Sequence, residues 1–210
     1  MHPTRQKLLD TGFAIVTAKG LRGLTVRELA AQAGVNLGTF VYHFGNRDAF
    51  IDELVELWYA PLFTGLKSVA QRGEHASAMA AFAATMQALI EFAAAQRSFI
   101  NHLIGDALAG EVAAQRFLLS VPQRHPLLLL DLIRQAQAQG ALRAGHPLQL
   151  MIFIMGAVGM PLILGGGAHQ LAWLSASAAP LLEQIDSPDA ARQRLAWALD
   201  GVRATQGEQA

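Results

Sequence analysis

The amino-acid sequence predicts an all-α protein. Apolar side chains recur at spacings of three and four residues along most of the 210 residues. Alternating runs of Val, Ile and Thr, which are typical of half-buried strands, do not occur. Glycines and helix-capping residues separate the apolar segments at intervals that are typical of helix ends. These three observations favour a chain built from helices and short connections.

The expected helices follow one another closely. Thr25 and Glu28 form a capping-box pattern at the start of the second helix, and Gly34 ends it. Gly45 fits a helix stop, and Asn46 fits the N-cap of a long fourth helix. The expected helices cover residues 4–19, 25–33, 37–44, 47–68, 77–95, 98–109, 112–120, 127–139, 148–164, 169–184 and 189–204.

Composition excludes several classes of protein. Hydrophobic residues make up 52% of the chain and charged residues 15%, which excludes a disordered chain. The absence of cysteine excludes a disulfide framework, a thiolate metal site and a cysteine nucleophile, and it fits a reducing cytoplasm. No two histidines stand at the spacing of a metal-binding helix, so we expect neither a metal nor another cofactor.

Charge is distributed unevenly. The net charge of zero excludes a uniformly basic coat for nucleic acid, but the first fifty residues contain six basic and three acidic residues. The remaining 160 residues contain ten basic and thirteen acidic residues. This asymmetry predicts a basic module on a neutral-to-acidic body.

The segment from Val26 to Phe44 has the pattern of a helix-turn-helix. A small residue stands where two helices cross, a glycine stands at the turn, and apolar anchors occur on both sides. These positions are Leu29, Ala30, Ala33, Gly34, Val35, Phe40 and Phe44.

The wider stretch GLTVRELAAQAGVNLGTFVYHFGNRDAF, from Gly23 to Phe50, resembles the DNA-binding signature of the tetracycline-repressor (TetR) family of bacterial regulators. The resemblance covers residues 4–54 almost without gaps. It implies an N-terminal three-helix DNA-binding domain over residues 1–47 and a helical ligand-binding and dimerisation domain over residues 48–205. Two positions depart from the family: Val41 replaces a tyrosine and Gly45 replaces a lysine, and both changes are expected to reduce phosphate anchoring.

The resemblance also implies which residues contact DNA. Asn36, Leu37 and Thr39 begin the helix that enters the major groove. The amide of Asn36 suits adenine or a phosphate there, and Leu37 suits a thymine methyl group. The others are expected near phosphates. The predicted DNA-binding residues are Thr25, Arg27, Asn36, Leu37, Thr39, Tyr42, His43 and Arg47.

Simpler interpretations remain for several of these positions. Phe40 and Phe44 are expected to be core residues rather than base-stacking groups. Thr25 can be a cap alone, and His43 can be packed against its neighbours. Arg5, Lys7 and Lys19 can form a solvated face, although the first two can also approach flanking phosphates.

The C-terminal body has more methionine and aromatic residues than its charge suggests. The resemblance implies a pocket there for a small apolar or aromatic effector; the alternative is that these residues are core. His102 and Asp106 form either a surface pair or a polar handle in the pocket. The predicted pocket residues are Trp58, Phe82, Met86, Phe99, His102, Phe117, Met151 and Met155.

Residues 150–168 are uncharged and long enough to cross a membrane. Pro161 and three consecutive glycines argue against a span and leave about twelve of these nineteen residues as the clearly helical part. We therefore expect no membrane but a buried helix at a twofold dimer interface, with Met155 and Gly159 in the seam. A second interface helix is expected within residues 189–204, where Leu195, Leu199 and Val202 form a stripe.

These patterns predict a cytoplasmic, ligand-responsive transcriptional regulator. The resemblance implies a repressor that binds a palindromic, double-stranded DNA operator as a homodimer. One alternative is a helical small-molecule enzyme, for which His102 and Asp106 would provide acid–base groups. The other is a ligand-binding scaffold that has lost DNA binding, an interpretation suggested by Val41 and Gly45.

Overall fold

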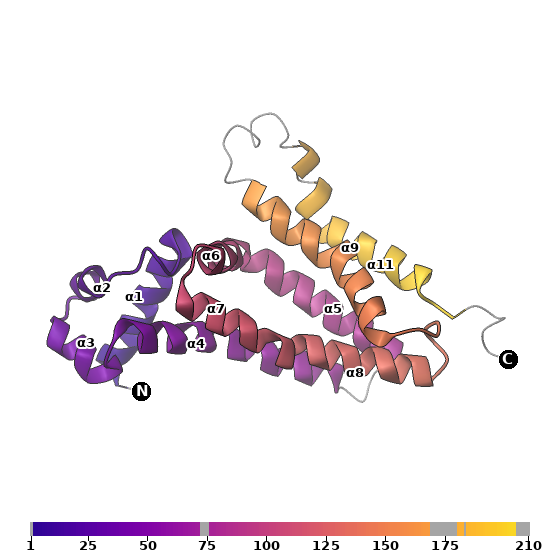
Figure 1. The fold of residues 1–210 in the computed structure, drawn as a ribbon, viewed down its shortest axis with the longest axis horizontal. Coiled ribbons are helices and arrows are strands. Elements are labelled where there is room, and N and C mark those ends of the chain that lie inside the picture. Colours follow the sequence, from indigo (N-terminus) through magenta and orange to yellow (C-terminus); the bar gives the residue numbers. More distant parts are fainter. Residues whose placement is uncertain (1, 72–75, 169–179, 183, 205–210) are drawn as a thin grey trace. The chain divides into compact units, whose positions relative to one another are not determined.

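The computed structural model describes residues 2–71, 76–168, 180–182 and 184–204, which form helices joined by turns, with an isolated β-bridge between Leu142 and Arg203 (Figure 1). The helices are α1 (Pro3–Lys19), α2 (Val26–Gln32), α3 (Leu37–Phe44), α4 (Arg47–Ala70), α5 (Ala78–Ala95), α6 (Arg97–Leu108), α7 (Val112–Ser120), α8 (His125–Ala138), α9 (Pro147–Ala168) and α11 (Pro188–Gly201). The all-α prediction is confirmed. The helix expected over residues 169–184 lies largely outside the described residues.

Side-chain caps begin the N-terminal helices as the sequence predicts. The hydroxyl of Thr25 accepts a hydrogen bond from the Glu28 N–H at 3.2 Å, and the amide oxygen of Asn46 accepts one from Ala49 N–H at 2.9 Å. Glu28 does not complete the box, because its carboxylate accepts hydrogen bonds from Lys19 and Gln32 instead. The cap is therefore one-sided.

The chain divides into two compact units. Unit 1 comprises Met1–Pro61 and Ser98–Val121, and unit 2 comprises Leu62–Arg97 and Pro122–Ala210. The core of unit 1 joins Leu29 and Phe40 of the helix-turn-helix to Ile51 of α4 and Phe99 of α6. Unit 1 thus extends beyond residue 47. The predicted boundary at residue 47 between a DNA-binding domain and a ligand-binding domain stays a prediction.

Unit 2 is built from α5, α8, α9 and α11, and α9 lies beside α11 (Figure 1). Of the described helices, α5 is long and apolar enough to cross a membrane. Its residues Phe82, Met86 and Ile90 nevertheless belong to a buried cluster that includes Ile154 and Leu195. One side of α5 is therefore buried in the core of unit 2.

The helix α9 continues through Pro161 and the three glycines, so the expectation of about twelve clearly helical residues is wrong. Proline has no N–H to donate to the carbonyl four residues earlier. That carbonyl belongs to Ala157, and it accepts a hydrogen bond from Nε of Arg194 at 2.9 Å. A side chain of α11 thus satisfies the carbonyl group that Pro161 leaves without a helical partner.

Candidate nucleic-acid interface

A tight turn positions α3 after α2. Gly34 has a φ angle of +64°, a left-handed conformation that favours glycine. The Gly34 N–H donates to the Ala31 carbonyl, and the Val35 N–H donates to the Ala30 carbonyl, at 3.1 and 2.9 Å. These two hydrogen bonds form a Schellman motif, which ends α2 and reverses the chain. Asn36 then caps α3, accepting a hydrogen bond from the Thr39 N–H at 2.8 Å.

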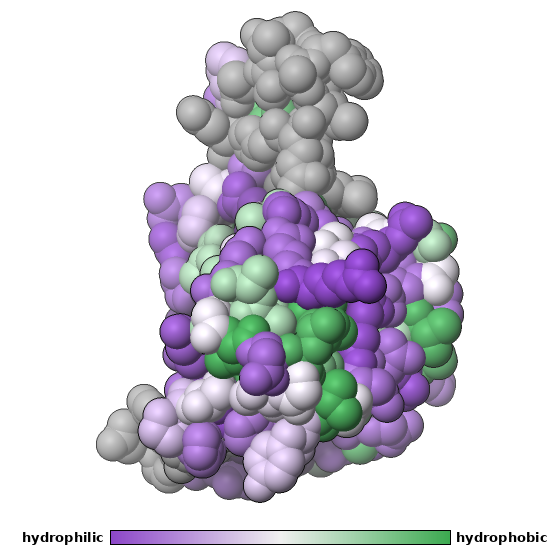
Figure 2. Space-filling model, turned by 90° about the vertical axis from the view of Figure 1, so that its left-hand side faces the viewer, coloured by the Kyte–Doolittle hydropathy of each residue, from purple (hydrophilic) through white to green (hydrophobic). Residues whose placement is uncertain are grey.

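One face of α3 is buried and the opposite face is exposed. Phe40 and Phe44 pack against Phe50 with ring centroids 5.5 and 4.8 Å apart, which confirms that both are core residues. Leu37, Val41 and Tyr42 point outward and are 46%, 55% and 85% exposed. Figure 2 views the side of the molecule where α2 and α3 lie in Figure 1, and apolar groups gather there on a largely hydrophilic face.

The remaining polar side chains of α3 contact their neighbours. His43 is half-buried, and its ring lies 5.0 Å from that of Tyr42 and 5.1 Å from that of His2. The hydroxyl of Thr39 lies 3.0 Å from Oδ1 of Asn36 and donates to it. These contacts favour the packed interpretation of His43, and base or phosphate contacts for both residues stay predictions.

Three of the six basic residues in the first fifty form intramolecular ion pairs. Arg5 pairs with Glu53, Lys19 with Glu28, and Arg47 with Glu111. The other three, in the part of unit 1 that the structure describes, are exposed and have no ion pair. They are Lys7, Arg22 and Arg27.

Arg47 is bound within the protein, in contrast to the phosphate contact predicted for it. Its guanidinium donates to the carbonyls of Leu21 and Leu24 at 2.6 and 2.9 Å and to the carboxylate of Glu111 at 3.0 Å. The side chain of Glu111 is only 11% exposed. Partial burial raises the pKa of Glu111, but the hydrogen bond and the positive charge of Arg47 outweigh burial and hold that pKa below its ordinary value.

Asp106, like Arg47, binds the connection between α1 and α2, which contains Leu21 and Leu24. Its carboxylate accepts a hydrogen bond from the Leu21 N–H at 2.5 Å and lies 3.4 Å from the Arg22 nitrogen. Gly20 leaves room for this approach, because a Cβ there would lie 2.6 Å from the carboxylate. Among the described residues Asp106 has no hydrogen bond to His102, so the surface pair is wrong, and a polar handle in a pocket stays a prediction. The signal that the sequence analysis missed is the pair of acids, Asp106 and Glu111, at the end of α6 and just before α7.

Seven of the eight predicted effector-pocket residues fall into two separate clusters, and His102 belongs to neither. Trp58, Phe99 and Phe117 belong to the core of unit 1 or pack against it. The core of unit 2 contains or is contacted by the other four, Phe82, Met86, Met151 and Met155. Met86 and Phe99 are each only 1% exposed, and Phe82 is fully buried, so these side chains fill the two cores. An effector site among the eight residues stays a prediction.

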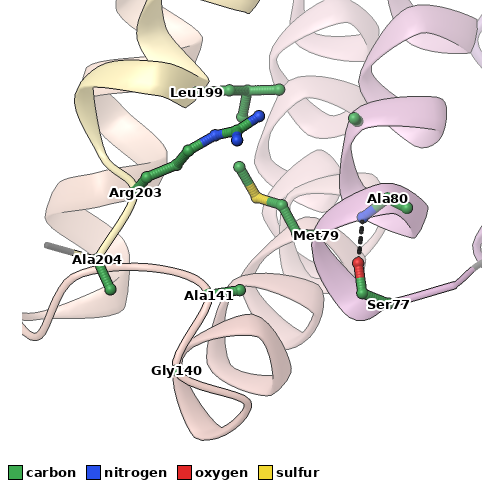
Figure 3. A pocket seen from close by; sticks show the side chains of 9 residues that line it. Ser77, Met79, Ala80, Gly140, Ala141, Leu199, Arg203 and Ala204 are labelled. Atoms are coloured by element: carbon green, nitrogen blue, oxygen red, sulfur yellow. Dashed lines mark hydrogen bonds between the residues drawn. The ribbon is translucent and has the colours of Figure 1, made fainter. Parts of the chain in front are cut away.

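Unit 2 contains an open pocket of about 500 Å³ that the sequence analysis did not anticipate (Figure 3). Its lining includes Met79 at the start of α5, Leu199 of α11 and Arg203 just after α11. The lining is completed by small residues of α5 and its cap, of the turn after α8 and of the segment after α11: Ser77, Ala80, Ala83, Gly140, Ala141 and Ala204. The Ala204 N–H donates to the Ala141 carbonyl at 3.2 Å. The sequence gives little signal for this pocket, because small residues from three distant segments form most of it.

Large apolar side chains are exposed on both α9 and α11. The exposed positions of α9 include Ile152, Phe153 and Met160, and Trp197 is exposed on α11. We call these four residues the α9–α11 face. Leu195, Leu199 and Val202 are buried in the core of unit 2, so the interface stripe predicted for them is wrong. Met155 is partly buried against this core and Gly159 is also half-buried, so their place in a dimer seam stays a prediction.

Comparisons with known proteins agree with the helix-turn-helix. Residues 8–54 match the family model described as bacterial regulatory proteins, tetR family. The transcriptional repressor KstR2 of Rhodococcus jostii (strain RHA1) is 30% identical over 69 residues, and NemR of Escherichia coli (strain K12) is 34% identical over 73 residues. These matches cover 33% and 35% of this chain and 34% and 37% of the two repressors, so about a third of each protein is aligned.

Solved structures resemble the chain over nearly its whole length. A TetR-family regulator from Mesorhizobium loti MAFF303099 has a TM-score of 0.68, 14% identity and coverage of 96% of this chain and 97% of its own. KstR2 of Mycobacterium tuberculosis, described as a ketosteroid transcriptional regulator, has a TM-score of 0.64, 19% identity and coverage of 98% and 97%. At these identities the likeness shows the fold. Residues 8–54 are thus similar to the DNA-binding segment of tetR-family regulatory proteins, and the described chain has the fold of solved TetR-family structures.

Proposed function

We propose that the chain is a ligand-responsive transcriptional repressor that binds a palindromic operator as a homodimer in the cytoplasm. The observation that carries this proposal is the outward face of α3, where Leu37, Val41 and Tyr42 are exposed on a helix anchored by Phe40 and Phe44. A helix presented in this way can enter the major groove of DNA. The names of KstR2 and NemR as repressors favour repression over activation.

The free basic residues of unit 1 are suited to hold the DNA backbone. Arg27 lies in the first turn of α2, beside the capping residue Thr25. Lys7 lies close to the turn of the helix-turn-helix, because a Cβ on Gly34 would be 3.5 Å from its ammonium nitrogen. Cations next to a helix that enters the groove can pair with phosphates and set its register.

The salt dependence of DNA binding tests this assignment. We expect Arg27→Ala and Lys7→Ala each to lower the slope of log K against log salt concentration by about one, because each loses one phosphate contact. Arg47→Ala should leave the slope unchanged, because its guanidinium is bound to Leu21, Leu24 and Glu111. Fluorescence anisotropy with a duplex measures all three slopes. A fall of one for Arg47 would restore its predicted phosphate contact.

The enzyme alternative loses its motivating pair, since Asp106 binds Leu21 rather than His102. The scaffold alternative is tested by the same anisotropy measurement. A chain that binds no duplex with sequence preference at low salt would favour the scaffold, whatever the effect of Arg27→Ala on the slope.

The effector is proposed to be a small, largely apolar molecule. The pocket in unit 2 is one candidate site, because Met79 and Leu199 provide apolar contact and Arg203 provides a cation at its edge (Figure 3). A ligand releases DNA only if it binds the non-DNA conformation better, and typical couplings change affinity by roughly 5- to 150-fold.

Filling the pocket tests whether the effector binds there. A panel of apolar compounds is first screened for those that raise the melting temperature and release DNA. We then expect Ala83→Trp, which fills the pocket, to abolish the melting-temperature shift and leave DNA affinity intact. The control is Ala144→Trp at an exposed position outside the pocket lining. An effector that still stabilises the Ala83→Trp variant must bind elsewhere, and the predicted residues around Met86 would then be tested.

A further inference from the structure

The outward face of α3 is nearly devoid of hydrogen-bonding groups. Leu37, Gly38, Val41 and Tyr42 form this face, since they occupy positions i, i+1, i+4 and i+5 of one helix and all are exposed. Leu37 and Val41 carry only hydrocarbon, and Gly38 has no side chain. The hydroxyl of Tyr42 is therefore the one side-chain group of this face that can form a hydrogen bond.

The polar residues at the start of α3 are occupied by the helix cap. Oδ1 of Asn36 accepts hydrogen bonds from the Thr39 N–H and from the Thr39 hydroxyl, at 2.8 and 3.0 Å. A hydroxyl has one proton to donate, so Thr39 can donate to a base only by breaking this contact. The cap thus occupies Oδ1 of Asn36 and the hydroxyl proton of Thr39, so these two groups can contact a base only at the expense of the cap, while the amide N–H groups of Asn36 take no part in it.

Thymine offers a different kind of contact in the major groove. Its C5-methyl group is the apolar feature that distinguishes a base pair there. Val41 suits such a contact because a β-branched side chain in a helix has one strongly preferred rotamer, which presents its methyl groups at a fixed place. Residues at i and i+4 have Cβ atoms about 5–6 Å apart, which is nearly the rise of two base pairs.

We propose that Leu37 and Val41 determine operator specificity by contacting the methyl groups of two thymines, about two base pairs apart in each half-site. This inference rests on the proposed DNA-binding function. The exposed Lys7 and Arg27 favour DNA over a protein partner as the occupant of this face, because they lie beside the helix-turn-helix and have no ion pair within the described part of unit 1. The valine that departs from the family pattern thereby acquires a role in base recognition.

The experiment uses the full chain and DNA in which single methyl groups are removed. A binding site is first selected from a library of randomised duplexes. Each thymidine of the selected site is then replaced by deoxyuridine, which lacks only the C5-methyl group and pairs with adenine in the same way. We expect two positions per half-site, about two base pairs apart, at which the replacement weakens binding by about fourfold per methyl group. Deoxyuridine elsewhere in the site should leave the affinity unchanged.

Matched variants assign each methyl group to a side chain. At one of the two positions, Val41→Ala should bind the thymidine and deoxyuridine duplexes with equal affinity. At the other position, the same variant should still bind the deoxyuridine duplex more weakly. Leu37→Ala should show the reverse pattern. Alanine favours the helix, so α3 is expected to form in both variants.

Two failures are distinguishable. If no sequence is enriched by the wild-type chain, the proposed function is wrong and this inference falls with it. If a site is enriched but contains no such thymines, or if its affinity is insensitive to deoxyuridine, DNA binding stands and the methyl-reading role of Leu37 and Val41 is overturned.

Discussion

Replacing Arg47 with alanine is expected to destabilise the protein by roughly 2–3 kcal/mol, because the carboxylate of Glu111 and two loop carbonyls lose their partner. For a chain of this size, such a change lowers the melting temperature by roughly 5–10 °C. The effect is large because Glu111 is mostly buried, so that water replaces the guanidinium only in part. Thermal unfolding followed by circular dichroism measures the shift.

A double-mutant cycle separates the ion pair from the other contacts of Arg47. Glu111→Gln alone removes the charge, and the combination with Arg47→Ala should be less destabilising than the sum of the single changes. The matched control is Arg116→Ala, which removes the exposed ion pair of Arg116 with Asp52 and should cost less than about 1 kcal/mol. Equal effects of Arg47→Ala and Arg116→Ala would mean that the network around Arg47 contributes little.

The same pair predicts a dependence on pH. The pKa of Glu111 is lower in the folded protein than its ordinary value of 4.5, so the charge stabilises the fold above that pH. This contribution is lost as the pH falls through the lowered pKa. The difference in unfolding free energy between the wild type and Glu111→Gln should therefore be constant above pH 4.5 and shrink below it.

Placing a charge on the α9–α11 face is expected to break the proposed homodimer. Ile152, Phe153, Met160 and Trp197 expose a set of large apolar side chains, with Phe153 at 55% and Trp197 at 63%. Exposed apolar patches of this kind mark association surfaces. Phe153→Asp would place an unpaired carboxylate in the interface, at a cost of about 3–5 kcal/mol, and raise the dissociation constant by at least a hundredfold.

Sedimentation velocity at micromolar concentration tests this second prediction. The wild type should sediment as a dimer and Phe153→Asp as a monomer with the same helix content. The control is Leu119→Asp, because Leu119 is also apolar and exposed but lies on α7 in unit 1. A monomeric wild type, or a dimer that survives Phe153→Asp, would exclude this face as the interface.

The N-terminal elements could be predicted because their signals are local. The Thr25 cap, the left-handed glycine at Gly34 and the Asn46 cap depend on residues at most four positions apart, and the structure confirms each. Phe40 and Phe44 are one turn apart, so their shared burial also follows from helix geometry. The sequence by itself therefore determined the N-terminal helices and the helix-turn-helix.

Other features were decided only by tertiary contacts. Arg47 has the charge and the position of a phosphate ligand, but Glu111, 64 residues away, lies within 3.0 Å of it. Pro161 should interrupt α9, yet Arg194 satisfies the carbonyl of Ala157. In each case the partner is distant in sequence, and no periodicity within a helix specifies which distant side chain will meet it.

The two sides of the C-terminal helices illustrate the same limit. The apolar residues of α11 occur all along the helix, so the sequence could not separate Leu195, which is buried in the core of unit 2, from Trp197, which is exposed. The hydropathy of a residue indicates that its side chain is more stable away from water. Whether another part of the same chain already covers that side chain depends on how α5, α8 and α9 pack against α11. Only the tertiary structure could therefore distinguish the core of unit 2 from the surface left for a partner.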